Sequence, residues 1–100
     1  MTEIATLTMQ SDNRLALSGD LTFVTVPEIW KQSLVLFSTI PELNFDLTEV
    51  KSSNSAGLAL LIEWLKYAKT QNKKISFQHV PTQLKSLIQA AGVEKLFNHN

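Results

Sequence analysis

The chain has 100 residues, 44% of them hydrophobic, with nine Lys and Arg against nine Asp and Glu and no cysteine, and this length predicts a single domain over residues 1–100. The absence of cysteine excludes disulfide frameworks and thiolate metal sites, and a formal net charge of zero argues against nucleic acid as a partner, because polyanion binding needs many cationic contacts. The longest apolar run, residues 58–62, is far shorter than the ~20 residues needed to span a bilayer.

The first part of the chain predicts a hairpin followed by a helix. Apolar and polar residues alternate over residues 5–9 and again over 15–18, which is typical of strands. The Ser-Asp-Asn sequence at 11–13 between them has turn chemistry. From about residue 25 to 38 the apolar residues recur at helical spacing. Thr25 stands at the predicted N-cap of this helix, just before a proline that suits its first turn.

The second part predicts two further strands and two helices. Residues 44–48 alternate as a third strand, and four short polar residues at 52–55 then begin a helix of about 56–71. Residues 75–77 form a fourth strand, and the last helix opens at a proline and stops at a glycine over 81–92. We therefore expect an α/β fold of order β-β-α-β-α-β-α. Because every strand alternates, the mixed sheet of about four strands should have helices mainly on one face, with the third and fourth strands parallel.

Side chains that could carry catalysis are sparse and scattered. The two imidazoles, His79 and His99, are twenty residues apart, so neither a paired-histidine metal site nor an activated nucleophile has local support. Asp46 and Glu49 could in principle do acid/base chemistry, but polar positions on an open sheet face explain them better. Four lysines near the end of the 56–71 helix are better explained as a solvated helix end than as a polyanion site. We therefore expect a protein that is not an enzyme and has no catalytic residue, metal or cofactor.

The polar turn at residues 54–58 is the first feature that calls for an explanation. Gly57 stands near the start of a helix, where glycine costs about 1 kcal/mol relative to alanine. In one interpretation Ser55 is a simple N-cap and Gly57 packs closely on a neighbouring loop. In the other, Ser55 is a surface hydroxyl at the positive end of a helix, where a phosphoryl group would be tolerated or a partner could dock. The residues alone favour the simple cap.

The second feature is an additional apolar stripe on the same helix. Leu60, Trp64 and Tyr67 recur at i, i+4 and i+7, almost opposite the core stripe that begins with Leu58 and Leu61. A helix that is apolar on two sides needs other parts of the protein to cover both of them. Either a neighbouring helix covers the second stripe, or it is exposed as a protein-binding surface, since Trp and Tyr are favoured interface anchors. The pattern leaves both alternatives open.

The turn and its surroundings resemble the STAS domain family, which includes anti-sigma factor antagonists. The resemblance covers nearly the whole chain, from the Leu-Ala-Leu-Ser-Gly-Asp sequence at 15–20 through Phe-Asp-Leu at 45–47 and Asn-Ser-Ala-Gly-Leu at 54–58 to Ala-Ala-Gly-Val at 90–93. Within the family, residues 15–20, 27–30 and 57–61 are most similar to the MlaB-like small STAS subunit of the bacterial Mla phospholipid ABC transporter.

The resemblance implies where the functional residues lie. Ser55 falls on the position that is phosphorylated in the sigma-regulatory members and that contacts the partner in the transporter subunit. Asn54 stands where Asp is usual, and Ala56 replaces a common Ser or Gly. We therefore predict partner contacts at two groups of residues, the turn formed by Asn54, Ser55, Ala56 and Gly57 and the stripe formed by Leu60, Trp64 and Tyr67.

The resemblance also implies partners and a location. The expected partner is an ABC transporter ATPase, within a complex that also holds permease and lipid-binding subunits and maintains outer-membrane lipid asymmetry. An anti-sigma factor kinase acting on Ser55 is the alternative. A third alternative is a ligand carrier or small enzyme that uses the open face of the sheet. The sequence also leaves a homodimer open. The first four residues show no basic segment followed by an apolar one, so we expect a cytoplasmic protein, peripheral to the inner membrane through its partner.

Overall fold

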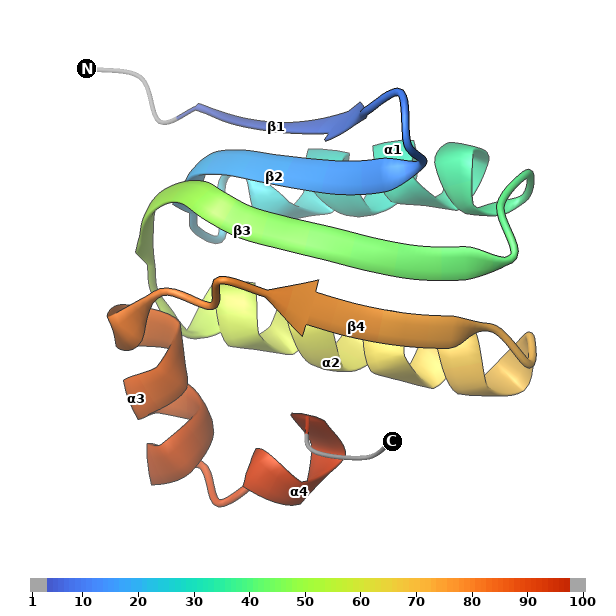
Figure 1. Ribbon diagram of the computed structural model, residues 1–100. Helices are drawn as coiled ribbons and strands as arrows, with labels where there is room; N and C mark the ends of the chain where they lie inside the picture. Colours follow the sequence, from blue (N-terminus) through green and yellow to red (C-terminus); the bar gives the residue numbers. More distant parts are fainter. Residues whose placement is uncertain (1–3, 98–100) are drawn as a thin grey trace.

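The chain folds into one sheet covered by helices, as seen in a computed structural model that describes residues 4–97 (Figure 1). In chain order the elements are β1 (Ala5–Met9), β2 (Arg14–Leu21), α1 (Val26–Phe37), β3 (Glu42–Ser53), α2 (Ser55–Thr70), β4 (Lys74–Gln78), α3 (Thr82–Ala90) and α4 (Glu94–Phe97). The predicted order is confirmed from β1 to α3. The four-residue helix α4 was not predicted, because such a short segment holds too few positions to show a helical period.

The strands lie in the order β1-β2-β3-β4. β1 pairs with β2 in antiparallel fashion, whereas β2 with β3 and β3 with β4 are parallel pairs. The predicted parallel pairing of the third and fourth strands is confirmed. The hairpin turn is closed by a hydrogen bond from the N–H of Gln10 to the carbonyl oxygen of Arg14 at 2.8 Å, and Asn13 takes a left-handed φ of 64°. Asn tolerates that conformation, so the predicted turn chemistry is confirmed.

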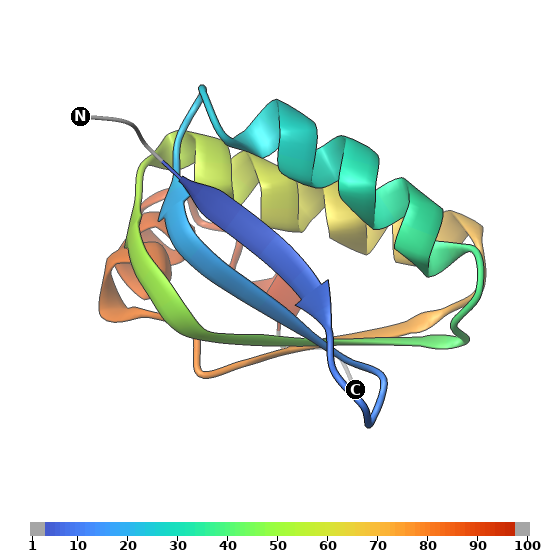
Figure 2. The same cartoon turned by 90° about the horizontal axis from the view of Figure 1, so that it is seen from above.

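The two faces of the sheet differ as the alternation predicts. Leu15, Leu17 and Phe45 are fully buried beneath the helices, and Figure 2 shows α1 and α2 lying together on that face. On the other face small polar side chains meet across the strands: Thr6 lies 2.5 Å from Ser18, and the Ser76 hydroxyl donates to Asn44 at 2.9 Å.

β3 is longer than its alternating pattern suggests. The strand runs over Glu42–Ser53 instead of 44–48, and its pairing with β2 shifts register twice, between Ala16 and Ser18 and again between Gly19 and Asp20. Such irregularities break the two-residue period, so the pattern in the sequence stops before the strand does. Residues 52 and 53, expected to open the following helix, belong to the strand.

The centre of the core is aromatic and corrects the prediction for the Leu60, Trp64 and Tyr67 stripe. Leu60 and Trp64 are 2% and 0% exposed, and Tyr67 is half-buried. The Trp64 ring stacks on Phe45 at a centroid distance of 4.2 Å, and its indole N–H donates to the hydroxyl of Ser33 on α1 at 2.9 Å. α2 packs on the sheet and on α1, so its two apolar stripes are both covered. The expectation of an exposed binding stripe is therefore wrong.

Candidate partner-binding site

The start of α2 is capped by Asn54 and not by Ser55. Asn54 has extended backbone geometry, and its side-chain oxygen accepts a hydrogen bond from the N–H of Ala56 at 2.8 Å. Ser55 is the first residue of the helix and is exposed. The interpretation of Ser55 as the N-cap is therefore wrong, and its hydroxyl faces solvent at the positive end of the helix dipole.

Gly57 is explained by close packing against two strand ends. A Cβ atom added to Gly57 would lie 1.9 Å from Ser53 Oγ and 3.0 Å from Leu21 Cβ. A side chain at this position therefore requires the Ser53 hydroxyl to move and crowds the side chain of Leu21. Ala56 and Gly57 are both buried, which corrects the prediction that they contact a partner. Ala56 and Gly57 instead fix the position of the turn, which holds Asn54 and Ser55 at the surface.

The loop between β2 and α1 is held by threonine hydroxyls. Thr25 Oγ1 donates to the carbonyl oxygen of Asp20 at 2.6 Å and accepts from the N–H of Thr22 at 3.0 Å. Thr25 occupies the N-cap position of α1 but makes no side-chain capping bond to the helix, so its predicted capping role is wrong. This internal bonding leaves Phe23 and Val24 projecting into solvent, each 71% exposed.

This loop and the start of α2 lie at the same end of the sheet, as both views show (Figures 1 and 2). The N–H of Asn54 donates to the carbonyl oxygen of Leu21 at 3.1 Å, and the Ser52 hydroxyl donates to the Asp20 carboxylate at 2.7 Å. We call the exposed residues gathered here, Phe23, Val24, Asn54 and Ser55, the docking end.

The docking end combines two apolar side chains with a hydroxyl at a helix N-terminus. Sequence reasoning found Asn54 and Ser55 but missed Phe23 and Val24. Two large apolar residues between the end of a strand and Pro27 were the available signal.

The first turn of α2 holds no acidic residue, so an anionic group there would meet the helix dipole without repulsion from carboxylates of that turn. Further along α2 the exposed side is lined by Ala59, Glu63 and Lys66.

Asp46, one of the two carboxylates considered for acid/base chemistry, is held by hydrogen bonds, whereas Glu49 is exposed. Asp46 accepts hydrogen bonds from the Thr48 hydroxyl at 2.6 Å and the Thr48 N–H at 3.0 Å, and it lies 3.1 Å from His79 Nδ1. The Thr48 bonds, with a smaller contribution from His79, lower the pKa of Asp46 to about 2. A group with this pKa is ionised at neutral pH and is a poor general acid or base. His99 lies outside the described residues.

Comparisons with known proteins agree with this architecture. A family model described as "Mlab, STAS domain" matches residues 5–98. A solved anti-sigma factor antagonist from Mycobacterium paratuberculosis is similar, with a TM-score of 0.73 at 21% identity, over 97% of this chain and 84% of that one. The anti-sigma factor antagonist SpoIIAA in its unphosphorylated form gives a TM-score of 0.72 at 12% identity, over 94% and 85% of the two chains.

The two structural likenesses show the fold, which is the one the sequence analysis expected. No curated protein sequence matches the chain. Over residues 4–97, the helices are all too short or too polar to span a membrane.

Proposed function

This chain belongs to the STAS domain family, and we propose that it is a non-catalytic subunit that binds and supports the ATPase of an ABC-type phospholipid transporter. The observation that carries the proposal is the match of residues 5–98 to the Mlab-type family model. In this role the protein sits in the cytoplasm, held at the inner membrane by its partner in a complex with permease and lipid-binding subunits.

The docking end supports a binding role. Phe23 and Val24 expose apolar area beside the polar turn of Asn54 and Ser55, and a small apolar centre with a polar rim is a common composition for a protein interface. Both loops are tied to the sheet by the hydrogen bonds described above, and Ser53 is also tied to α3, because its N–H donates to the side chain of Gln83 at 2.9 Å. A surface held in this way loses little conformational entropy on binding.

Co-purification with the cognate ATPase tests the proposal. Val24→Asp and Ser55→Arg place a charge or a bulky group in the docking end, and we expect each to weaken the complex by tenfold or more. The matched control is Val35→Asp, since Val35 is 73% exposed against 71% for Val24 and lies near the far end of α1, about 14 Å along the helix from its first residue, Val26. Failure of the wild-type protein to retain the ATPase would contradict the proposal, whereas retention by both variants at wild-type affinity, with unchanged melting temperatures, would exclude the docking end as the contact surface.

A second candidate is an anti-sigma factor antagonist that is switched by phosphorylation of Ser55. It is favoured by the two solved structures, both anti-sigma factor antagonists, and by the exposure of Ser55 at a helix N-terminus without acidic residues. A phosphoryl group there would add about −1.5 to −2 charges at pH 7 to the surface a partner meets. Intact-mass measurement after incubation with the cognate kinase decides this. An unchanged mass with an active kinase removes the switch, and a shift that Ser55→Ala abolishes supports it.

A further inference from the structure

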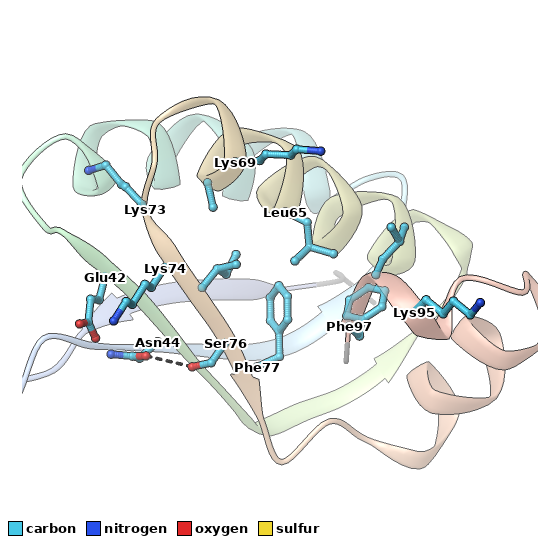
Figure 3. A pocket seen from close by; sticks show the side chains of 13 residues that line it. Glu42, Asn44, Leu65, Lys69, Lys73, Lys74, Ser76, Phe77, Lys95 and Phe97 are labelled. Atoms are coloured by element: carbon cyan, nitrogen blue, oxygen red, sulfur yellow. Dashed lines mark hydrogen bonds between the residues drawn. The ribbon is translucent and has the colours of Figure 1, made fainter. Parts of the chain in front are cut away.

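A groove runs along the free edge of the sheet, away from the docking end. It lies between α2 and β4, with α4 as a third wall, and its volume is about 890 Å³. Figure 3 shows Leu65 from α2 and Phe77 from β4 pointing toward one another across it, with Phe97 beside them. Phe77, Leu65 and Ile75 are each half-buried, so the floor of the groove is apolar and open to solvent.

The groove concentrates positive charge in a chain that is neutral overall. Its lining holds four of the nine basic side chains and one of the nine acidic ones, namely Lys69, Lys73, Lys74, Lys95 and Glu42. The ammonium of Lys73 is turned away and donates to carbonyl oxygens at the end of α1 and just beyond it. Within residues 4–97 the other three lysines form no ion pair with a carboxylate.

The strand that borders the groove has a free edge. Among residues 4–97, β4 is the last strand of the sheet and pairs with β3 alone. A strand paired on one side presents alternate N–H and C=O groups on its other side, ready to pair with another extended chain. A second copy of this protein would bring the same lysines to the contact, so like charges oppose self-pairing. An acidic segment would instead be attracted by the three lysines.

We propose that the groove binds an extended acidic segment of a partner protein, which adds to β4 as a fifth strand. Because β4 has five residues, the segment pairs over about 17 Å. Side chains of an added strand alternate between two sides. Apolar ones face α2 and cover Leu65 and Phe77, and acidic ones face the open side of the sheet, where Lys74 lies. Lys69 and Lys95, on α2 and α4, attract the segment at longer range. This contact is independent of the docking end and gives the protein a second partner surface.

The test uses the full-length ¹⁵N-labelled protein and a blocked heptapeptide that alternates Glu with Val. We expect shift changes and slowed amide exchange confined to β4 and the adjoining part of α2, with an affinity that falls as salt is raised. Lys74→Gln should weaken binding by about two- to fivefold, the range of single exposed ion pairs, and Lys69→Gln and Lys95→Gln, whose charges lie on the helix side, by less than about twofold. Lys31→Gln removes the same charge from the exposed side of α1 and should leave binding unchanged.

Two further peptides separate strand pairing from charge and from apolar contact alone. The same heptapeptide N-methylated at alternate residues keeps its charges but loses the N–H groups of one edge, so we expect at least tenfold weaker binding. The Lys-Val heptapeptide should not bind. Equal binding of the methylated peptide, or no response to the Glu-Val peptide at millimolar concentration, overturns the proposal. Binding of dodecanoate in the groove without a response to the peptide also overturns it, in favour of a lipid anion.

Discussion

Replacing Ser33 with alanine should destabilise the protein through the buried indole of Trp64. Both residues are 0% exposed, and Ser33 Oγ accepts from Trp64 Nε1 at 2.9 Å while donating to the carbonyl oxygen of Trp30 at 2.7 Å. Ser33→Ala leaves the indole N–H buried without its partner, and an unsatisfied buried donor costs about 1–3 kcal/mol. For a domain of this size each kcal/mol lowers the melting temperature by about 4–8 °C.

Ser38→Ala is the matched control for this experiment. Ser38 is exposed, and its hydroxyl donates to the carbonyl oxygen three residues before it, that of Val35, at 2.9 Å, as Ser33 does within α1. We expect Ser38→Ala to change the free energy of unfolding by less than about 0.5 kcal/mol.

A double-mutant cycle with Trp64→Phe isolates the bond itself, and the two substitutions should couple by at least about 0.5 kcal/mol. Urea denaturation of the four proteins supplies the values. The reasoning is refuted if Ser33→Ala costs no more than Ser38→Ala, or if the cycle shows no coupling.

Three further predictions concern the turn, the open sheet face and the end of α1. Gly57→Ala gains about 1 kcal/mol of helix propensity but forces a Cβ to within 1.9 Å of Ser53 Oγ, a strain of about 1–3 kcal/mol. It should lower the melting temperature in the wild-type background and much less in Ser53→Ala, and equal losses in the two would show that the clash is not the cause. Because the pKa of Asp46 is lowered from 3.8 to about 2, its carboxylate stabilises the fold above pH 4 and this contribution is lost as the pH falls to 2. Denaturant unfolding should show the stability difference between wild type and Asp46→Asn shrinking over that interval, and a difference independent of pH would argue against the assignment. Lys73→Met removes the ammonium that donates to the carbonyl oxygens of Phe37 and Ile40, and thermal unfolding should show a loss of about 1–3 kcal/mol. Lys74→Met, at an exposed neighbour, should change little, and similar losses in both would refute the capping role of Lys73.

Because Trp64 lies in the core, its truncation is unsuitable as a probe of partner binding. Trp64→Ala would remove a ring that stacks on Phe45 inside the core, and such truncations cost about 3–5 kcal/mol. Native domains are stable by only about 5–15 kcal/mol, so loss of a partner in this variant would report partial unfolding. Variants at Val24 and Ser55 avoid this ambiguity because both residues are exposed.

The sequence by itself determined the features that depend on neighbours along the chain. The alternation over β1 and β2, the helical spacing in α1 and α3, and the turn at residues 11–13 all reflect local geometry, and each was confirmed. The open polar face of the sheet followed from the same alternation. The extent of β3 did not, because its register shifts against β2 depend on the pairing of two strands.

Only the tertiary structure decided which apolar surface is buried. Leu60 and Trp64 have the spacing of an exposed stripe or of a covered one, and the difference lies in α1, whose Ser33 meets the indole from 31 positions away in the chain. Phe23 and Val24 are as apolar as core residues, yet the hydrogen bonds of Thr25 hold their loop so that both face solvent. Periodicity describes one element at a time, whereas burial depends on which elements pack against each other. A reading of the sequence could therefore place Ser55 at the start of a helix but could not identify the apolar side chains beside it.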